Sequence, residues 1–100
     1  KYSAKKVLPK PGVYLTQCWL RHEGFYWGVT SIGSNPTFSG NSMNIESYLL
    51  NCHQDLYGKS MKVYFLSFLR EEKAFDTAEG LKRQISRDVK LAKKLIYKYR

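Results

Sequence analysis

The stretch GVYLTQCWLRHEGFYWGVTSI, residues 12–32, decides how this chain folds. Aromatic and β-branched residues recur through two runs, residues 12–22 and 25–32, and such residues favour strands. Glu23-Gly24 between them has the composition of a tight turn. The stretch therefore predicts a β-hairpin, and we expect neighbouring segments to extend its sheet.

Two later runs, residues 43–52 and 61–69, have the same strand-like composition, and residues 53–59 connect them. Residues 33–42 are predicted to be a loop, because they hold two glycines, one proline and several Ser and Asn residues. Such short links between successive strands predict antiparallel pairing.

The pattern changes after Phe75. Asp76 is the expected N-cap of a helix, with Glu79 three positions later completing a capping box. Apolar residues then recur every three or four positions, as on one face of an amphipathic helix: Ala78, Leu81, Ile85, Val89, Ala92 and Ile96. The predicted fold is therefore mainly β, with a C-terminal amphipathic α-helix.

The composition is that of one globular domain, since 100 residues with 43% hydrophobic content suffice for a single core. No apolar run is long enough for a membrane helix, and the Lys-rich start is not followed by the apolar segment of a signal peptide. The two cysteines, Cys18 and Cys52, are expected to be reduced thiols without a metal-binding pattern. A cytoplasmic location is expected, with no membrane partner.

The net charge of +9 is concentrated in the predicted helix. Residues 81–100 hold eight Lys and Arg against one Asp, a net +7. We interpret this run as the solvated outer face of the helix, and keep a nucleic-acid surface as the alternative. Nucleic acid is the less favoured partner, because aromatic residues do not alternate with these charges as they do in stacking surfaces.

Glu46 is the strongest candidate for chemistry. Strand alternation places it on the same face as Tyr48 and Leu50, opposite Ile45 and Ser47. If that face points inward, the carboxylate is partly desolvated and can act as a general base. If it points outward, Glu46 is an ordinary surface residue.

Two further segments are weaker candidates. The glycines, backbone amides and small hydroxyls of residues 32–40 suit a phosphate or a sugar, and they equally suit a plain hairpin connection. Arg70 could bind a polar edge of a ligand or pair in water with its neighbours Glu71 and Glu72.

Several motifs in this order resemble the riboflavin kinase family, and most of all the C-terminal kinase module of bacterial bifunctional FAD synthetases. The match runs from about Val7 to Ala92. Its motifs are LPKPGVY at residues 8–14, IGSNPTF at 32–38, IESYLL at 45–50, DLYGK at 55–59, FLREEKAFD at 68–76 and ISRDV at 85–89.

The resemblance implies a small antiparallel β-barrel of Greek-key type, closed by the C-terminal helix. It also implies a kinase that transfers the γ-phosphate of ATP to the 5′-hydroxyl of riboflavin, giving FMN and ADP. The family's glutamate in the strand after the Asn-Pro-Thr-Phe loop is the catalytic base, and Glu46 occupies that place.

By the same resemblance, the nucleotide is expected near Tyr57 and the flavin near Arg70. Asn35 is a further candidate contact of the nucleotide. Phe68 is the candidate for the aromatic wall of the flavin pocket, with Tyr64 and Phe65 as alternatives. Family members carry a Gly-x-Pro-Thr-Ala-Asn stretch shortly before the LPKPGVY segment, and its Thr and Asn hold Mg²⁺ and the phosphates. This sequence does not contain that stretch. We therefore expect no metal ligands within it, and a kinase domain truncated at its N-terminal side, with Mg²⁺ bound through an upstream segment.

The leading interpretation is thus a single riboflavin kinase domain that needs Mg²⁺ with ATP as co-substrate. An FMN adenylyltransferase module is expected upstream in the same natural chain. The alternative is a non-catalytic small β-barrel that binds nucleic acid through its basic C-terminal helix.

Overall fold

The computed structural model describes residues 9–37, 40–54 and 59–99. Within them lie four strands, one helix and a short 3-10 turn. Their bounds are β1 (Gly12–Leu20), β2 (Gly24–Thr37), β3 (Gly40–Leu49), β4 (Met61–Arg70), α1 (Ala78–Ile96) and η1 (Tyr97–Tyr99). The prediction of a mainly β fold with a C-terminal helix is confirmed, and none of the described helices is long and apolar enough to cross a membrane.

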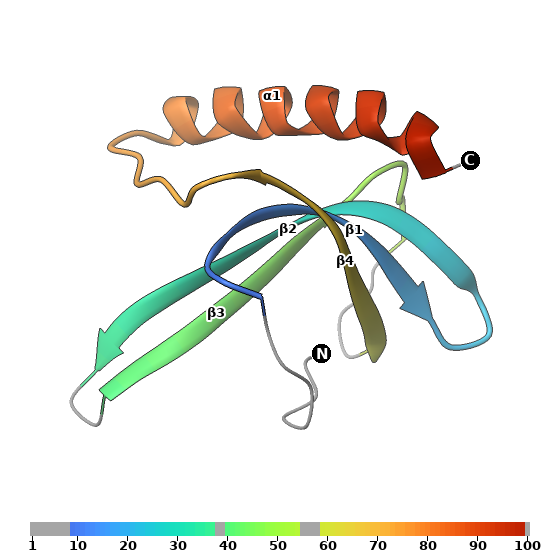
Figure 1. Cartoon of the computed structure of the whole chain (residues 1–100), viewed down its shortest axis with the longest axis horizontal. Helices are drawn as coiled ribbons and strands as arrows, with labels where there is room; N and C mark the ends of the chain where they lie inside the picture. The colour runs from blue at the N-terminus through green and yellow to red at the C-terminus, as the bar shows by residue number, and fades with distance from the viewer. Residues whose placement is uncertain (1–8, 38–39, 55–58, 100) are drawn as a thin grey trace.

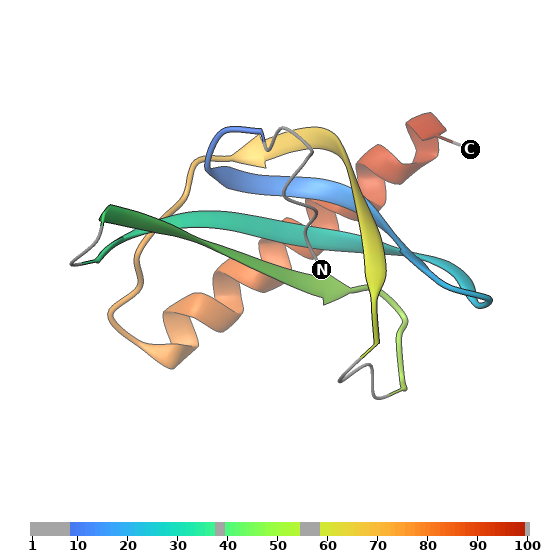
Figure 2. The same cartoon turned by 90° about the horizontal axis from the view of Figure 1, so that it is seen from below.

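The strands form one antiparallel sheet in the order β3-β2-β1-β4. This is the Greek-key order, because the fourth strand returns to lie beside the first. Figure 1 shows α1 lying along one face of the twisted sheet, and Figure 2 shows that it crosses the strands obliquely. In the described ranges β3 and β4 form the two edges of the sheet, and closing the barrel would require a further pairing between them.

The prediction of a loop over residues 33–42 is wrong, because β2 runs to Thr37 and β3 begins at Gly40. The described β1–β2 pairing ends at Gly12 and Ile32, so beyond Ile32 the ladder of β2 is with β3 alone. A proline is tolerated in such a one-sided segment, since its missing N–H can face away from the ladder. Pro36 occupies this segment.

Other boundaries shift by one to three residues. The hairpin turn comprises residues 21–23, where His22 has a φ of 66°, and β2 begins directly after it at Gly24, which has a φ of 83°. β3 ends at Leu49 rather than at residue 52, and Asn51 follows with a φ of 57°. The N-cap of α1 is Thr77 rather than Asp76, because the Gly80 N–H donates to the Thr77 side chain at 3.0 Å.

The core lies between α1 and the face of the sheet to which Val13, Leu15 and Val29 belong. Ala92 and Ile96 of the predicted helical stripe are buried against these residues, whereas Leu81 at the start of the stripe is 43% exposed. The seven basic residues from Lys82 to Lys98 are all exposed, as predicted for the outer face of the helix.

The opposite face of the sheet carries a buried row of hydroxyl groups. Thr16 Oγ1 lies 2.8 Å from Thr30 Oγ1, which lies 2.8 Å from Ser47 Oγ, so three strands are joined side to side. Gly28 leaves room for the row, because a Cβ there would lie 3.0 Å from Thr16 Oγ1 and 3.2 Å from Cys18 Sγ. Burial raises the pKa of the Cys18 thiol, which favours its protonated form.

Candidate active site

A pocket of about 360 Å³ opens between the first half of α1 and the adjoining face of β1, β2 and β3. Its size is that of a site for a small organic molecule. Sheet residues, the segment after β4 and the helix all contribute to its lining, which is both apolar and charged: Val13, Val29, Ser31, Glu46, Ser47, Tyr48, Arg70, Glu72, Lys73, Phe75, Leu81, Ile85 and Asp88.

Glu46 lines this pocket from β3 and is itself exposed. Its register partner is Ser31 of β2, which pairs in turn with Val13 of β1, so Glu46 belongs to the face of the sheet that α1 covers. The helix begins near this point and leaves the carboxylate accessible. The sequence left an inward and an outward orientation open, and the structure combines a place on the helix side with access to solvent.

Arg70 joins the end of β4 to the middle of α1. Its Nε and Nη2 donate to the two carboxylate oxygens of Asp88, each at 2.8 Å, and its Nη1 donates to the Glu71 carbonyl at 2.9 Å. The Gln84 amide donates a further hydrogen bond to Asp88, which is buried. Such a bidentate pair with an added donor holds the helix in a defined position beside the pocket.

Three of the five N–H groups of Arg70 are used in these hydrogen bonds. Arg70 also lines the pocket, so its guanidinium edge can face a ligand while the other edge stays on Asp88. The sequence suggested pairing with the neighbouring acids as the alternative role for Arg70, but the described side-chain partner is Asp88, eighteen residues away.

Phe68 lies away from this pocket. It pairs with Tyr14 in the β1–β4 register, on the opposite face from Val13, and its ring centroid is 5.3 Å from that of Tyr14. Lys10 Nζ lies 4.4 Å from the Phe68 ring centroid. The structure thus brings Glu46 and Arg70 together in one pocket and places Phe68 elsewhere.

The structure describes little of the two residues that are predicted to contact the nucleotide. The backbone of Asn35 pairs with Ser42, in the same β2–β3 ladder that pairs Ser31 with Glu46. Tyr57 lies outside the described residues. Both assignments stay predictions.

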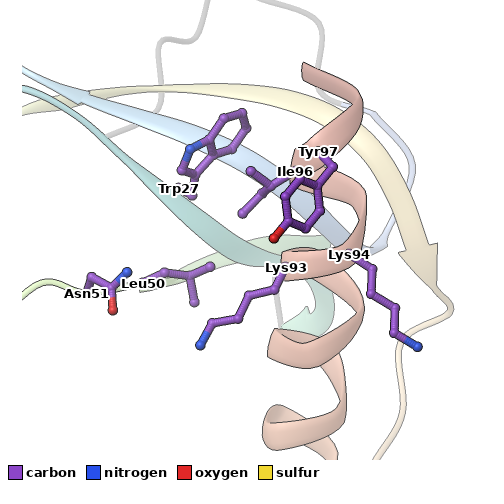
Figure 3. A pocket seen from close by; sticks show the side chains of 7 residues that line it. All are labelled: Trp27, Leu50, Asn51, Lys93, Lys94, Ile96 and Tyr97. Atoms are coloured by element: carbon purple, nitrogen blue, oxygen red, sulfur yellow. The ribbon is translucent and has the colours of Figure 1, made fainter. Parts of the chain in front are cut away.

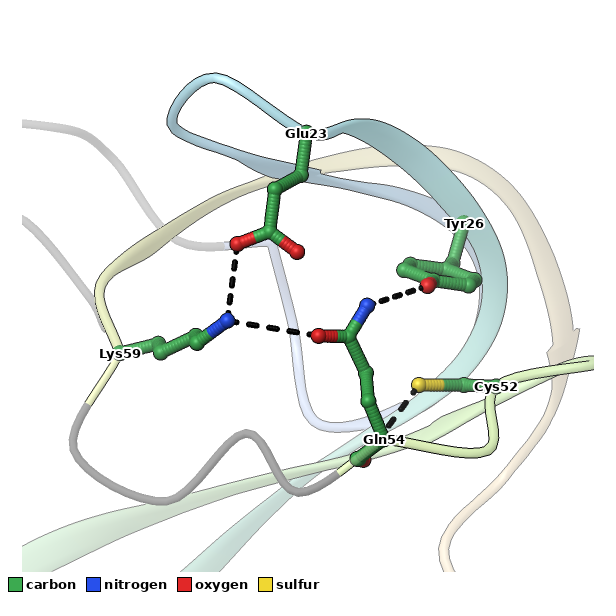
Figure 4. A network of polar contacts seen from close by, with 5 residues as sticks. All are labelled: Glu23, Tyr26, Cys52, Gln54 and Lys59. Carbon is green, nitrogen blue, oxygen red and sulfur yellow. Dashed lines mark hydrogen bonds and ion pairs between the residues drawn. The ribbon is translucent and has the colours of Figure 1, made fainter.

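The residues that flank the Tyr57 segment are fastened to the β1–β2 hairpin by a polar network (Figure 4). Lys59 Nζ donates to Glu23 Oε2 at 2.8 Å and to Gln54 Oε1 at 3.3 Å, and the Gln54 amide donates to the Tyr26 hydroxyl at 2.7 Å. The hydrogen bond from Lys59 lowers the pKa of Glu23 below its ordinary value. These contacts bring the two ends of the connection between β3 and β4 together at the hairpin.

The described residues do not form a protein-only metal site. No group of three or more His, Cys, Asp or Glu side chains in the described part of the chain is arranged to hold a metal ion. Asp88, the buried carboxylate at the pocket, is already bound by Arg70 and Gln84.

Sequence reasoning missed Asp88, Phe75 and Glu72 as part of the site. Asp88 carried one available signal, since it is the only acid among the nine charged residues of 81–100. Such an isolated acid on a basic helix suggests a specific partner. Phe75 carried no comparable signal, because only the path of the chain between β4 and α1 brings it to the pocket.

Comparisons with a family model and with curated proteins point to the same family. The family model Flavokinase, for riboflavin kinase, matches residues 1–96. An RNA-binding riboflavin kinase of Bacillus subtilis (strain 168) is 37% identical over 79 residues, which cover 78% of this chain and 34% of that protein.

Two bifunctional riboflavin kinase/FMN adenylyltransferases show similar likeness. That of Haemophilus influenzae is 34% identical over 89 residues, covering 89% of this chain and 29% of the relative. That of Escherichia coli (strain K12) is 36% identical over 84 residues, covering 84% and 27%. The chain thus spans about a third or less of the length of these relatives.

A solved structure supports the fold. A Streptococcus pneumoniae protein titled a macrolide-efflux protein superposes with a TM-score of 0.81 and 29% sequence identity, over 87% of this chain and 28% of that one. The likeness therefore covers most of the length of this chain.

Proposed function

Because this chain belongs to the riboflavin kinase family, we propose that it transfers the γ-phosphate of ATP to the 5′-hydroxyl of riboflavin, giving FMN and ADP. The observation that carries the proposal is the position of Glu46, an accessible carboxylate at a pocket with apolar walls. A flat apolar ring needs such walls, and a primary alcohol needs a base within hydrogen-bond reach.

In the proposed reaction Glu46 accepts the proton of the riboflavin hydroxyl. The hydroxyl oxygen forms a bond to the γ-phosphorus, the bond from that phosphorus to the bridging oxygen breaks, and ADP leaves with the electron pair. Most of the rate enhancement in such a transfer comes from positioning the reactants and stabilising charge. Glu46 orients the nucleophile, and the Arg70–Asp88 pair fixes the helix that covers the pocket.

The binding roles follow the same proposal. The flavin ring lies against Phe75, Leu81 and Ile85, with Arg70 at a polar edge. Asn35 and Tyr57 contact the nucleotide, and Mg²⁺ accompanies ATP as part of the co-substrate. Phe68 is kept as a flavin contact only if the ligand reaches the opposite face of the sheet.

We extend the proposal to context and location. The bifunctional relatives join riboflavin kinase and FMN adenylyltransferase in one protein, and we propose the same arrangement for the natural protein that carries this sequence. Both cysteines are free, which suits a reducing compartment, and we propose the cytoplasm.

A non-catalytic nucleic-acid-binding barrel is the less supported alternative, because the family model spans almost the whole chain. One relative is nevertheless named both RNA-binding and a riboflavin kinase. RNA binding would therefore accompany the kinase activity in this chain rather than replace it.

The test is Glu46→Gln in the full natural protein, incubated with riboflavin, ATP and Mg²⁺, with flavins separated by chromatography. We expect kcat for FMN formation to fall about 10²–10⁴-fold with little change in riboflavin binding, since only the proton acceptor is lost. The matched control is Glu71→Gln, an exposed carboxylate that does not line the pocket. Near-normal turnover by Glu46→Gln would remove Glu46 from the base role, and a folded wild-type protein that forms no FMN would refute the kinase assignment.

A further inference from the structure

A second pocket, of about 330 Å³, lies at the other end of α1, between its last turns and the ends of β2 and β3. Leu50 and Ile96 form its apolar floor, and Trp27, Asn51 and Tyr97 stand around it (Figure 3). Lys93 extends along it towards Asn51, and Lys94 leaves the helix on the other side. We call these residues the basic–aromatic groove. The kinase reaction proposed for Glu46 uses none of them.

The charge of the groove is not balanced locally. Its described lining contains two lysines and no Asp or Glu, and the acid closest to it along α1, Asp88, is buried against Arg70. Lysines near the C-terminus of a helix also stabilise its dipole. That general role does not account for the aromatic rings beside them, of which Tyr97 is 74% exposed.

The aromatic surface continues beyond the groove onto the hairpin. The Trp27 ring centroid lies 6.1 Å from that of Tyr99 and 5.5 Å from that of Phe25, and the Phe25 ring is stacked on Trp19 at 4.7 Å. Trp19, Phe25 and Tyr99 are each about 40% exposed. These four rings form an aromatic track that leads away from the lysines.

Exposed rings beside unbalanced lysines match the chemistry of single-stranded nucleic acid. Every nucleobase has a face that stacks on an aromatic side chain, and each linking phosphate attracts a lysine. From sequence alone the basic helix lacked aromatic neighbours, but the fold supplies them from β1, β2 and η1. The track is longer than one ring, so it suits successive nucleotides of a strand.

We propose that the basic–aromatic groove and the aromatic track bind single-stranded nucleic acid, with Lys93 and Lys94 contacting phosphates and Tyr97 stacking on a base. This activity lies at a different site from the proposed kinase reaction and does not depend on it.

The first test uses a fluorescent single-stranded oligoribonucleotide of about ten nucleotides, within the usual range of such sites. Its binding to the full natural protein is followed by anisotropy. The double variant Lys93→Ala/Lys94→Ala is compared with Lys82→Ala/Lys90→Ala, which removes the same charge from exposed positions of the same helix outside the groove.

We expect the groove variant to weaken binding at least about tenfold and to reduce the slope of log K against log salt by about 1.4, two phosphate contacts at about 0.7 each. The matched pair should change affinity less than about threefold and leave the slope nearly unchanged. Equal losses in the two variants would overturn the proposal in favour of diffuse attraction to the whole helix. FMN formation by the groove variant should equal that of wild type, so failure of the kinase proposal is detected separately.

The second test concerns stacking. Tyr97→Ala should weaken binding at least about fivefold, whereas Tyr97→Phe, which keeps the ring, should bind within about twofold of wild type. Wild-type affinity in Tyr97→Ala would overturn the role of the ring. A deoxyribonucleotide strand of the same sequence tests which sugar is preferred, and displacement of the strand by AMP at equal phosphate concentration would overturn a strand site in favour of a mononucleotide site.

Discussion

Two ion pairs of equal length join distant parts of this chain in different surroundings. Arg70 Nε lies 2.8 Å from Asp88 Oδ1, and Lys59 Nζ lies 2.8 Å from Glu23 Oε2. The side chains of the first pair are 23% and 5% exposed, and those of the second are 42% and 34% exposed. From the distances alone, the two ion pairs would be expected to contribute equally to the stability of the fold.

The difference lies in what each carboxylate loses when its partner is removed. Asp88 has little contact with water and depends on Arg70 and Gln84 for its hydrogen bonds, whereas Glu23 can exchange Lys59 for water. A buried charge without its partner is costly, and an exposed pair contributes little. The Arg70–Asp88 pair therefore holds the helix to the sheet at the proposed active site. The Lys59–Glu23 pair only joins the end of the β3–β4 connection to the hairpin at the surface.

The largest effect is expected from Arg70→Ala, which leaves the buried Asp88 carboxylate without its guanidinium partner. The free energy of unfolding, measured by urea titration, should fall by about 3–5 kcal/mol, and riboflavin binding should weaken because the helix loses its anchor beside the pocket. Lys59→Ala, which removes the basic partner of the more exposed Glu23, is the control and should cost far less. Similar losses in the two variants would mean that burial does not distinguish the pairs.

An intermediate effect is expected from Arg70→Lys. Lysine keeps the charge but replaces a planar two-point contact with a single ammonium group, so one charge-assisted hydrogen bond to Asp88 is lost. We expect a loss of about 1.5–3 kcal/mol in the same titration. A loss as large as that of Arg70→Ala would show that the two-point geometry rather than the charge of Arg70 holds the helix in place.

The smallest effect is expected from Glu23→Gln, and it should depend on pH and salt. Because Lys59 lowers the pKa of Glu23 in the folded protein, the ionised carboxylate adds stability above its ordinary pKa. That stability is lost as pH falls through the lowered pKa. The urea midpoints of wild type and Glu23→Gln should differ slightly at pH 7 in low salt and converge in high salt or in acid. A difference that persisted in acid would contradict an ionic origin.

Much of the fold could be predicted from local patterns. The hairpin, the helix and the antiparallel pairing follow from residue alternation, helical spacing and short links, and each is confirmed. The prediction of a loop over residues 33–42 was wrong because it rested on composition alone and took no account of the hydrogen-bonded pairing between β2 and β3. Gly33 and Pro36 favour turns in isolation, but here they lie in a strand segment paired on one side.

The site could be predicted in part. Glu46 and Arg70 were singled out and share one pocket, yet the pairing of Arg70 with Asp88 depends on how α1 crosses the sheet, which no local spacing reports. The N-cap shows the same limit at short range. Asp76 and Thr77 are both suitable caps, and the choice of Thr77 depends on the path by which the chain leaves β4.

The buried hydroxyl row has a consequence for the alignment of the strands. A slip of one residue between β2 and β3 would turn every side chain to the wrong face, so hydrophobic burial alone forbids it. A slip of two residues keeps the faces, and burial cannot exclude it. That slip would break the Thr30–Ser47 hydrogen bond and leave the half-buried Ser47 hydroxyl without this partner, while moving Glu46 about 7 Å along the strand. The Thr30–Ser47 hydrogen bond in the hydroxyl row thus favours the observed register of β2 and β3. That register determines the position along β3 at which the Glu46 carboxylate lines the pocket.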